Sequence, residues 1–134
     1  MPTFKTEDYE LDTRGFEVEE LDDCVALIPP DGDAAMQITA FVADGSEVTD
    51  AEIAEASADG APEEAPREPV TCGDFRGFES RFVGEDGAWR VWWLAAGDCH
   101  LYVTYNGAEE DAGRHDAEVD ALMASLRLRK KAGS

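Results

Sequence analysis

The side chains most capable of chemistry are a cysteine and a histidine that follow each other directly in the sequence. Cys99 and His100 suggest a thiol–imidazole pair. Neighbouring residues on a β-strand point to opposite faces of the sheet, however, so the thiol and the ring cannot meet there. We therefore interpret Cys99 as a buried structural residue. Cys72 could react as a nucleophile, but no neighbour in sequence marks a lowered pKa.

The carboxylates do not predict a metal site. Residues 31–33 (Asp-Gly-Asp) begin like a calcium loop, but two alanines follow and the twelfth position holds no glutamate. The acids at 109–111 are explained by a helix start, where the helix dipole favours negative charge. His100 and His115 are far apart, so a histidine-based site is not expected. We predict no metal, no cofactor and no catalytic residue, since phosphate-loop, dinucleotide and nucleophile-elbow motifs are also missing.

A group of aromatic and basic side chains is the strongest candidate for a binding surface. Tryptophan, tyrosine and arginine dominate the hot spots of protein interfaces. The candidates are Arg81, Trp89, Trp93, His100 and Tyr102. The alternative is that a helix covers this side of the sheet as a second, smaller core. We favour that alternative, with a helix that begins at Thr49 as the cover.

These residues lie in a segment, 75–106, that predicts three antiparallel strands. Residues 85–87 suit a three-residue loop with Gly87 in the left-handed position, and residues 97–98 suit a two-residue turn. These turns pair Phe78 with Leu94, and Leu94 with Leu101. The predicted core face carries Phe78, Phe82, Trp92, Leu94, Cys99, Leu101 and Val103. The other face carries Glu79, Arg81, Val91, Trp93, His100, Tyr102 and Thr104.

Three further strands are predicted in the first third of the chain. Residues 16–21 alternate apolar and acidic side chains, as a half-buried strand does. Residues 24–28 form a short apolar strand, and residues 35–42 return after a turn at 29–33, which is rich in proline, aspartate and glycine. These strands would form hairpins that extend the sheet.

Two helices are predicted, one after each set of strands. The first begins at Thr49, because Thr49 and Glu52 have the spacing of a capping box, and it ends near Gly60. The second runs from about Glu109 to Arg127. Its apolar stripe consists of Val119, Leu122, Met123 and Leu126.

The predicted fold is a single α+β domain over residues 1–134. Its order is β-β-β-α-β-β-β-α, with two main helices packed on an antiparallel sheet of about six strands. Residues 1–14 would form an N-terminal arm, residues 61–69 a mobile, acidic, proline-rich loop, and residues 129–134 a frayed tail. The hydrophobic fraction of 43% is enough for a real core.

Charge is the outstanding feature of the composition. Thirty-one acidic residues against eleven basic ones give a net charge of −20. Such a field repels nucleic acids and anionic membranes and attracts basic partners. The other explanation is a highly soluble protein from an organism with an acidic proteome, adapted to a salty environment, and we favour it because the acids are spread along the whole chain. The three cysteines lack paired spacing, and the N-terminus has no apolar leader, so we expect a cytoplasmic protein.

Several segments together resemble the PsbP-like superfamily. They are the PPDGD hairpin, the capped helix after its return strand, the strand GDFRGFESRF, the hairpin WRVWWLAAGDCHLYVTY and the closing helix that ends in ASLRL. That superfamily includes the photosystem II subunit P, the Ran-binding Mog proteins and small bacterial proteins of unknown function. The resemblance covers residues 15–128, implies a binding or assembly module rather than an enzyme, and carries over no site residues.

Three functional hypotheses follow. The first is a small, non-enzymatic binding module, such as an acidic inhibitor or immunity-like protein for a basic partner. The second is a small-ligand binder or enzyme with a pocket over the aromatic sheet face, formed with the loop at 61–69 and lined by Arg81, Trp93, His100 and Tyr102. The third is a homodimer, built through the same aromatic face, with a purely structural role.

Overall fold

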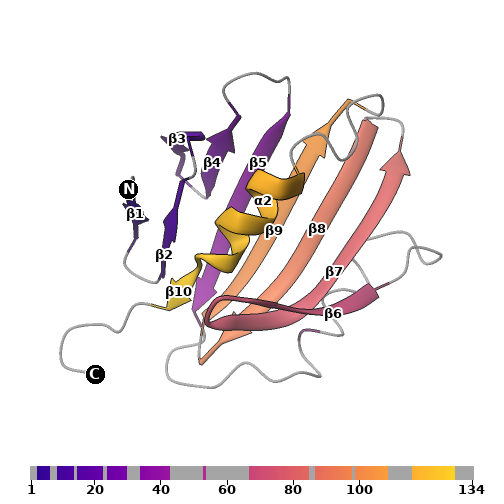
Figure 1. Ribbon diagram of the computed structural model, residues 1–134. Coiled ribbons are helices and arrows are strands. Elements are labelled where there is room, and N and C mark those ends of the chain that lie inside the picture. The colour runs from indigo at the N-terminus through magenta and orange to yellow at the C-terminus, as the bar shows by residue number, and fades with distance from the viewer. Residues whose placement is uncertain are drawn as a thin grey trace.

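The chain folds into two antiparallel sheets and a helix that packs on one face of the larger sheet (Figure 1). The computed structural model describes residues 3–6, 9–13, 15–22, 24–29, 34–42, 53, 67–84, 87–97, 99–108 and 116–128. Within these ranges, no helix has the length and apolar character needed to cross a membrane.

The larger sheet has seven strands in the order β3-β4-β5-β9-β8-β7-β6. Its strands are β3 (Glu17–Glu20), β4 (Val25–Ile28), β5 (Ala35–Val42), β6 (Arg67–Cys72), β7 (Phe75–Gly84), β8 (Gly87–Ala96) and β9 (Cys99–Gly107). The predicted strands at 16–21, 24–28 and 35–42 correspond to β3, β4 and β5. The crossover from β5 to β9 places the β7–β8–β9 meander beside the N-terminal hairpins.

The smaller sheet joins the two ends of the described chain. It consists of β1 (Thr3–Lys5), β2 (Tyr9–Asp12) and β10 (Arg127–Leu128), in the order β1-β2-β10. Within the predicted N-terminal arm, residues 3–5 and 9–12 are thus strands, and Tyr9 and Leu11 lie in the main core. The Asp12 amide also donates a hydrogen bond of 2.8 Å to Ser125 Oγ, which ties this sheet to the helix end.

The α+β prediction with two main helices is wrong. The described residues form ten strands and one continuous helix, α2 (Asp116–Ala124). The predicted helix at 49–60 lies outside the described residues except for Ile53, which is helical. The closing helix ends three residues earlier than predicted, and Arg127 belongs to β10.

The missed strands are ones that local pattern does not reveal. β1, β2 and β10 are two to four residues long and are held by pairing with distant parts of the chain. The loop predicted for residues 61–69 rested partly on Pro69. In the structure, residues 67–69 begin β6. This strand can contain a proline because it lies at the edge of the sheet. Residues 61–66 and 129–134 lie outside the described part of the chain.

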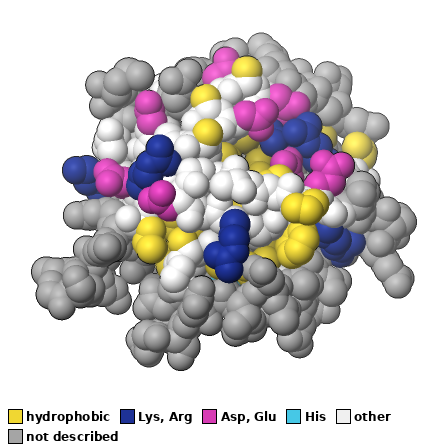
Figure 2. All heavy atoms as spheres, turned by 60° about the horizontal axis from the view of Figure 1, so that its bottom comes forward, with side chains coloured by type: hydrophobic (Ala, Val, Ile, Leu, Met, Phe, Trp, Pro, Cys, Tyr) yellow, Lys and Arg dark blue, Asp and Glu magenta, His cyan; other side chains and the backbone are white. Residues whose placement is uncertain are grey.

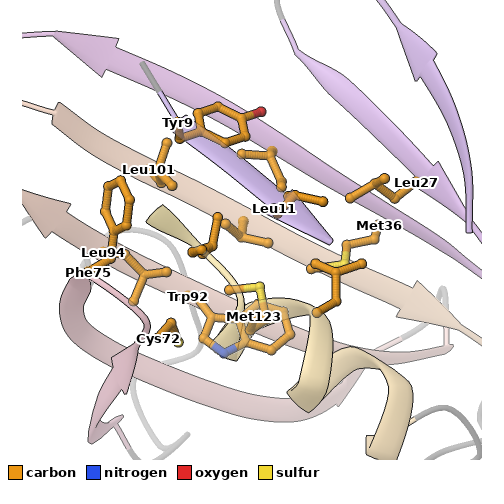
Figure 3. Close-up of a cluster of buried hydrophobic side chains, with 14 of the residues drawn as sticks. Tyr9, Leu11, Leu27, Met36, Cys72, Phe75, Trp92, Leu94, Leu101 and Met123 are labelled. Carbon is orange, nitrogen blue, oxygen red and sulfur yellow. The ribbon is translucent and has the colours of Figure 1, made fainter. Parts of the chain in front are cut away.

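The main core lies between the large sheet and α2. The stripe predicted for the closing helix, Val119, Leu122, Met123 and Leu126, is fully buried. It packs on Trp92, Leu94, Leu101 and Val103 of the sheet, and Figure 3 shows Met123, Trp92 and Cys72 in the same part of this cluster. We call this side of the sheet the helix face and the opposite side the aromatic face.

Candidate functional site

The pairing of β7 with β8 decides which candidate side chains share a face. Gly84 pairs with Gly87, so the loop between them has two residues, not three. Phe78 therefore lies opposite Trp93 rather than Leu94, and the predicted register is off by one residue. The β8–β9 register is as predicted, with Leu94 opposite Leu101.

This shift moves β7 side chains between the two faces, because alternate residues of a strand point in opposite directions. Phe78 and Phe82 lie on the aromatic face, not on the core face. Glu79 and Arg81 lie on the helix face, opposite Trp92 and Arg90. The five predicted binding residues are thus divided: Arg81 is on the helix face, and the other four are on the aromatic face.

The aromatic face holds a second, smaller core. Trp93 is only 1% exposed and packs with Val91, Ala95 and the fully buried Ile53. Tyr102 is partly buried against this cluster, with its ring centroid 6.3 Å from that of Trp93. Trp93 is therefore a core residue and does not form an exposed recognition surface.

His100 lies at another part of the aromatic face. Its ring is 6.1 Å from Phe41, a side chain that is 55% exposed. Cys99 is buried on the helix face, so the thiol and the imidazole point to opposite sides of the sheet, as predicted. The geometry gives no thiol–imidazole pair at these two positions.

A cluster of charged residues lies where α2 meets β7 and β8. Arg90 is at its centre, with its side chain only 7% exposed. Its Nε donates to Glu79 at 2.8 Å, and its terminal nitrogens donate to Asp116 at 3.1 Å and Asp120 at 2.7 Å. Arg81, which is largely exposed, also contacts Glu79 and Asp116, at 3.1 and 3.0 Å. We call these five residues the ion-pair cluster.

The ion-pair cluster keeps Arg90 charged inside the protein. Burial opposes the charge, but the hydrogen bonds that Arg90 donates to Glu79 and Asp120, together with their negative charges, outweigh it and raise the pKa of Arg90 above its usual value. The guanidinium also lies 4.7 Å from the centroid of the Trp92 ring, a cation–π contact. Arg90 thereby joins the helix, two strands and the main core.

Cys72 is buried beside this cluster and is not activated. Burial raises the pKa of its thiol to about 11, and the negative charge of Glu79 acts in the same direction. The thiol lines a pocket of about 210 Å³ together with Trp92, Asp120 and Met123. Because the thiolate is the nucleophile, this environment argues against a catalytic cysteine.

A second pocket opens on the other side of the ion-pair cluster, at the end of the β7–β8 hairpin. Its volume is about 230 Å³, and we call it the hairpin pocket. It is lined by Arg81, Phe82, Val83, Ala88, Trp89, Arg90, Tyr105 and Asp116. The lining is mostly apolar, Val83 is 57% exposed, and the rings of Phe82 and Trp89 are stacked 6.3 Å apart.

The hairpin pocket contains two of the predicted binding residues, Arg81 and Trp89. Sequence reasoning missed Arg90, Glu79, Asp116 and Asp120. Asp116 and Asp120 are four residues apart on α2 and so lie on one helix face. That spacing was the available signal, but nothing in the sequence alone connects it to an arginine on a distant strand.

No group of three histidine, cysteine or acidic side chains within the described ranges could hold a metal ion. The motifs at 31–33 and 109–111, and His115, lie outside those ranges. Figure 2 shows acidic and basic side chains close together on one face, with hydrophobic side chains between them.

The predicted resemblance is confirmed at the level of the fold by two solved structures, one of them a PsbP. A crystal structure from Bacteroides thetaiotaomicron is similar over 98% of this chain, with a TM-score of 0.71 and 17% identity. This chain spans about half of that longer one (49%). The solution structure of PsbP (CyanoP) from the cyanobacterium Synechocystis is similar over 96% of this chain and 92% of its own, with a TM-score of 0.58 and 12% identity. No protein-family model and no curated protein matches this sequence.

Proposed function

We propose that the protein is a non-enzymatic binding module for a basic protein partner. The observation that carries the proposal is the division of charge within the molecule. Arg90 and Arg81 are paired with Glu79, Asp116 and Asp120, so the ion-pair cluster itself has a formal charge of −1. The rest of the chain carries 28 acidic and nine basic residues, a net charge of −19.

Exposed acids illustrate the result. Strand β3, at one edge of the large sheet, exposes Glu17, Glu19 and Glu20 to solvent. Arg127 donates to the carbonyl oxygens of Ala124 and Leu126, so it also has partners within the chain. A negative field of this kind speeds the encounter with a basic partner and repels acidic ones.

The chemistry of the described side chains supports binding over catalysis. The Cys72 thiol has a raised pKa, and Cys99 and His100 lie on opposite faces. The similarity to PsbP-fold structures shows the fold alone and is compatible with this proposal. A cytoplasmic location is part of the proposal and is supported by three free cysteines, two of them buried.

Capture from a native lysate of the source organism tests the proposal. The whole chain is immobilised, and the lysate is applied at low and at high salt beside an unrelated acidic protein of similar net charge. We expect a basic protein to be retained at low salt by this chain and not by the control. Retention of nothing at either salt concentration, or of the same proteins by both columns, would overturn the proposal.

A further inference from the structure

We infer that the pocket beside Cys72 is an anchor site for the basic partner, and that it takes the side chain of one lysine or arginine of that partner. This inference rests on the proposed function and names the part of the partner that is recognised. We call this pocket of about 210 Å³, between β6, β7, β8 and α2, the Cys72 pocket. Its charge, its free acceptor atoms and its shape all fit a cation on an apolar stem.

The charge of the lining favours a cation. The lining includes Glu79 and Asp120 and, among the described residues, no lysine or arginine, so its formal charge is −2. Glu68 of β6, which is exposed, lies directly opposite Glu79 of β7. Like charges in this position destabilise a sheet. A cation that binds beside them relieves this repulsion.

The lining also has acceptor atoms that the ion-pair cluster leaves unused. Glu79 Oε2 accepts from both Arg90 and Arg81, and Asp120 Oδ1 accepts from Arg90. Glu79 Oε1 and Asp120 Oδ2 have no hydrogen-bond partner among the described residues. An ammonium or guanidinium group from a partner can donate charge-assisted hydrogen bonds to these two oxygens.

The Cys72 thiol experiences the negative potential of the same two carboxylates. Burial is the largest cause of its raised pKa, and the charges of Glu79 and Asp120 raise the pKa further, while the charge of Arg90 opposes them. An environment that disfavours a thiolate through neighbouring negative charges favours a cation at the same place. The nearby guanidinium of Arg90 therefore leaves the pocket attractive to a second cation.

The size and shape of the pocket suit one long side chain. Pockets for drug-sized ligands usually measure about 300–1,000 Å³, whereas protein interfaces often seat a single anchor residue in a pocket of the partner. Trp92, Met123 and Cys72 are buried at the base of the pocket, and Asp120 and Ala124 are exposed at its mouth. Figure 3 shows the first three side by side. Lysine and arginine combine an apolar stem, for contact with Met123, with a charged end.

Selection from a displayed library of random peptides, with the whole chain as bait, tests this inference. The tightest selected peptide that contains lysine or arginine is measured against the native chain and its variants by fluorescence anisotropy. Ala124→Lys places a cation of the chain itself at the mouth of the pocket. Ala117→Lys is the matched control, because Ala117 is also exposed on α2, receives the same charge and does not line the pocket.

A second pair of variants removes a negative charge in place of adding a positive one. Asp120→Asn and Asp116→Asn each remove one carboxylate of α2 that pairs with Arg90. Asp120 lines the Cys72 pocket and Asp116 does not, so the two variants differ in the charge of the pocket. Urea denaturation checks that all four variants are folded before binding is measured.

We expect the selected peptides to contain lysine or arginine, with one such residue whose replacement by alanine weakens binding by about tenfold. Ala124→Lys and Asp120→Asn should each weaken binding by about tenfold or more, while Ala117→Lys and Asp116→Asn stay within about threefold. If basic peptides bind but the members of each pair behave alike, the inference is wrong and the proposed function survives. If no basic peptide is selected, the inference is wrong as well, and the capture from lysate decides on the proposed function.

Discussion

At the scale of single residues, Arg90 has the largest structural role that the described contacts reveal. Its guanidinium contacts one carboxylate on β7 and two on α2, and it lies over the ring of Trp92. Removing one member of a buried ion pair leaves its partners as uncompensated charges, which costs more than the pair itself contributes. The helix face should therefore depend on this side chain more than on any exposed arginine.

We predict that Arg90→Met lowers the free energy of unfolding by about 3 kcal/mol, because Glu79 and its neighbours lose their central cation. Methionine keeps much of the apolar stem over Trp92, so the loss reports mainly on charge. Urea denaturation measures it. Arg81→Met is the control: its side chain is 54% exposed, and the loss should stay below about 1 kcal/mol. Equal losses in the two variants would contradict the central position of Arg90.

Cys72 gives a prediction about pH. Its thiol has a pKa raised from 9.0 to about 11 in the folded protein, so folding favours the protonated form. This contribution is fully present below pH 9 and is lost as the pH rises toward 11. We expect the stability of the native chain relative to Cys72→Ala to decrease between pH 9 and pH 11 and to be constant from pH 6 to pH 8. A difference that stays the same up to pH 11 would contradict the burial of the thiol.

At the scale of elements, the sequence predicts the register of a hairpin well where the turn residues are compatible with only one loop length. The β8–β9 turn contains Gly97 with a φ of +57°. The register predicted for these two strands is correct. Both Gly84 and Gly87 stand beside the β7–β8 turn, and two loop lengths are compatible with them. The observed two-residue loop stacks Phe82 on Trp89 and brings Glu79 to Arg90, contacts that only the folded structure provides.

The candidate site could be predicted only in part, for the same reason. Trp93 and Tyr102 were assigned correctly to the face opposite Trp92, because the β8–β9 pairing was correct. Arg81 was assigned to the wrong face by the one-residue error. The hairpin pocket also needs Asp116, which reaches β8 through the packing of α2, and no local pattern encodes that distance.

The turn between β6 and β7 gives a prediction at this scale. Gly73 has a φ of +60°, and a Cβ there would collide with the carbonyl oxygen of Leu126, just after α2. The next residue, Asp74, is bonded to the same segment: its amide donates to the Leu126 carbonyl at 3.1 Å. The glycine thus lets the β6–β7 turn approach the strand that follows the helix.

We predict that Gly73→Ala destabilises the fold more than Gly15→Ala does. Gly15 also has a positive φ, +88°, but a Cβ there meets no atom within 4 Å. Gly15→Ala should cost only backbone strain, about 1–2 kcal/mol, and Gly73→Ala should cost that strain plus a steric clash. Thermal denaturation of both variants measures the difference. Equal melting temperatures would contradict the close approach of the turn to Leu126.

At the scale of the whole molecule, the charge is the property that most needs an explanation. The exposed acids of β3 repel one another and the other acids of the chain, which opposes folding. The ion-pair cluster is more enclosed, and salt screens buried pairs less than exposed ones. Salt should therefore relieve the repulsion while leaving the cluster largely intact.

We predict that moderate salt stabilises the protein, with a rising urea midpoint as sodium chloride increases up to about 0.5 M, where the Debye length has become short. The variant with Glu17, Glu19 and Glu20 replaced by glutamine should be more stable at low salt and less sensitive to added salt. A midpoint that does not respond to salt in either protein would contradict the account of repulsion. This response is separate from binding, so it also measures how far the acidity alone affects folding.

The proposed recognition of a basic partner is tested most directly by the affinity for the retained protein as a function of salt. Isothermal titration of that purified protein with the whole chain, at a series of sodium chloride concentrations, gives the dissociation constant at each. We predict one site whose Kd rises steadily with salt, because salt screens the attraction between opposite charges. A Kd that is independent of salt, or an acidic partner, would contradict the account.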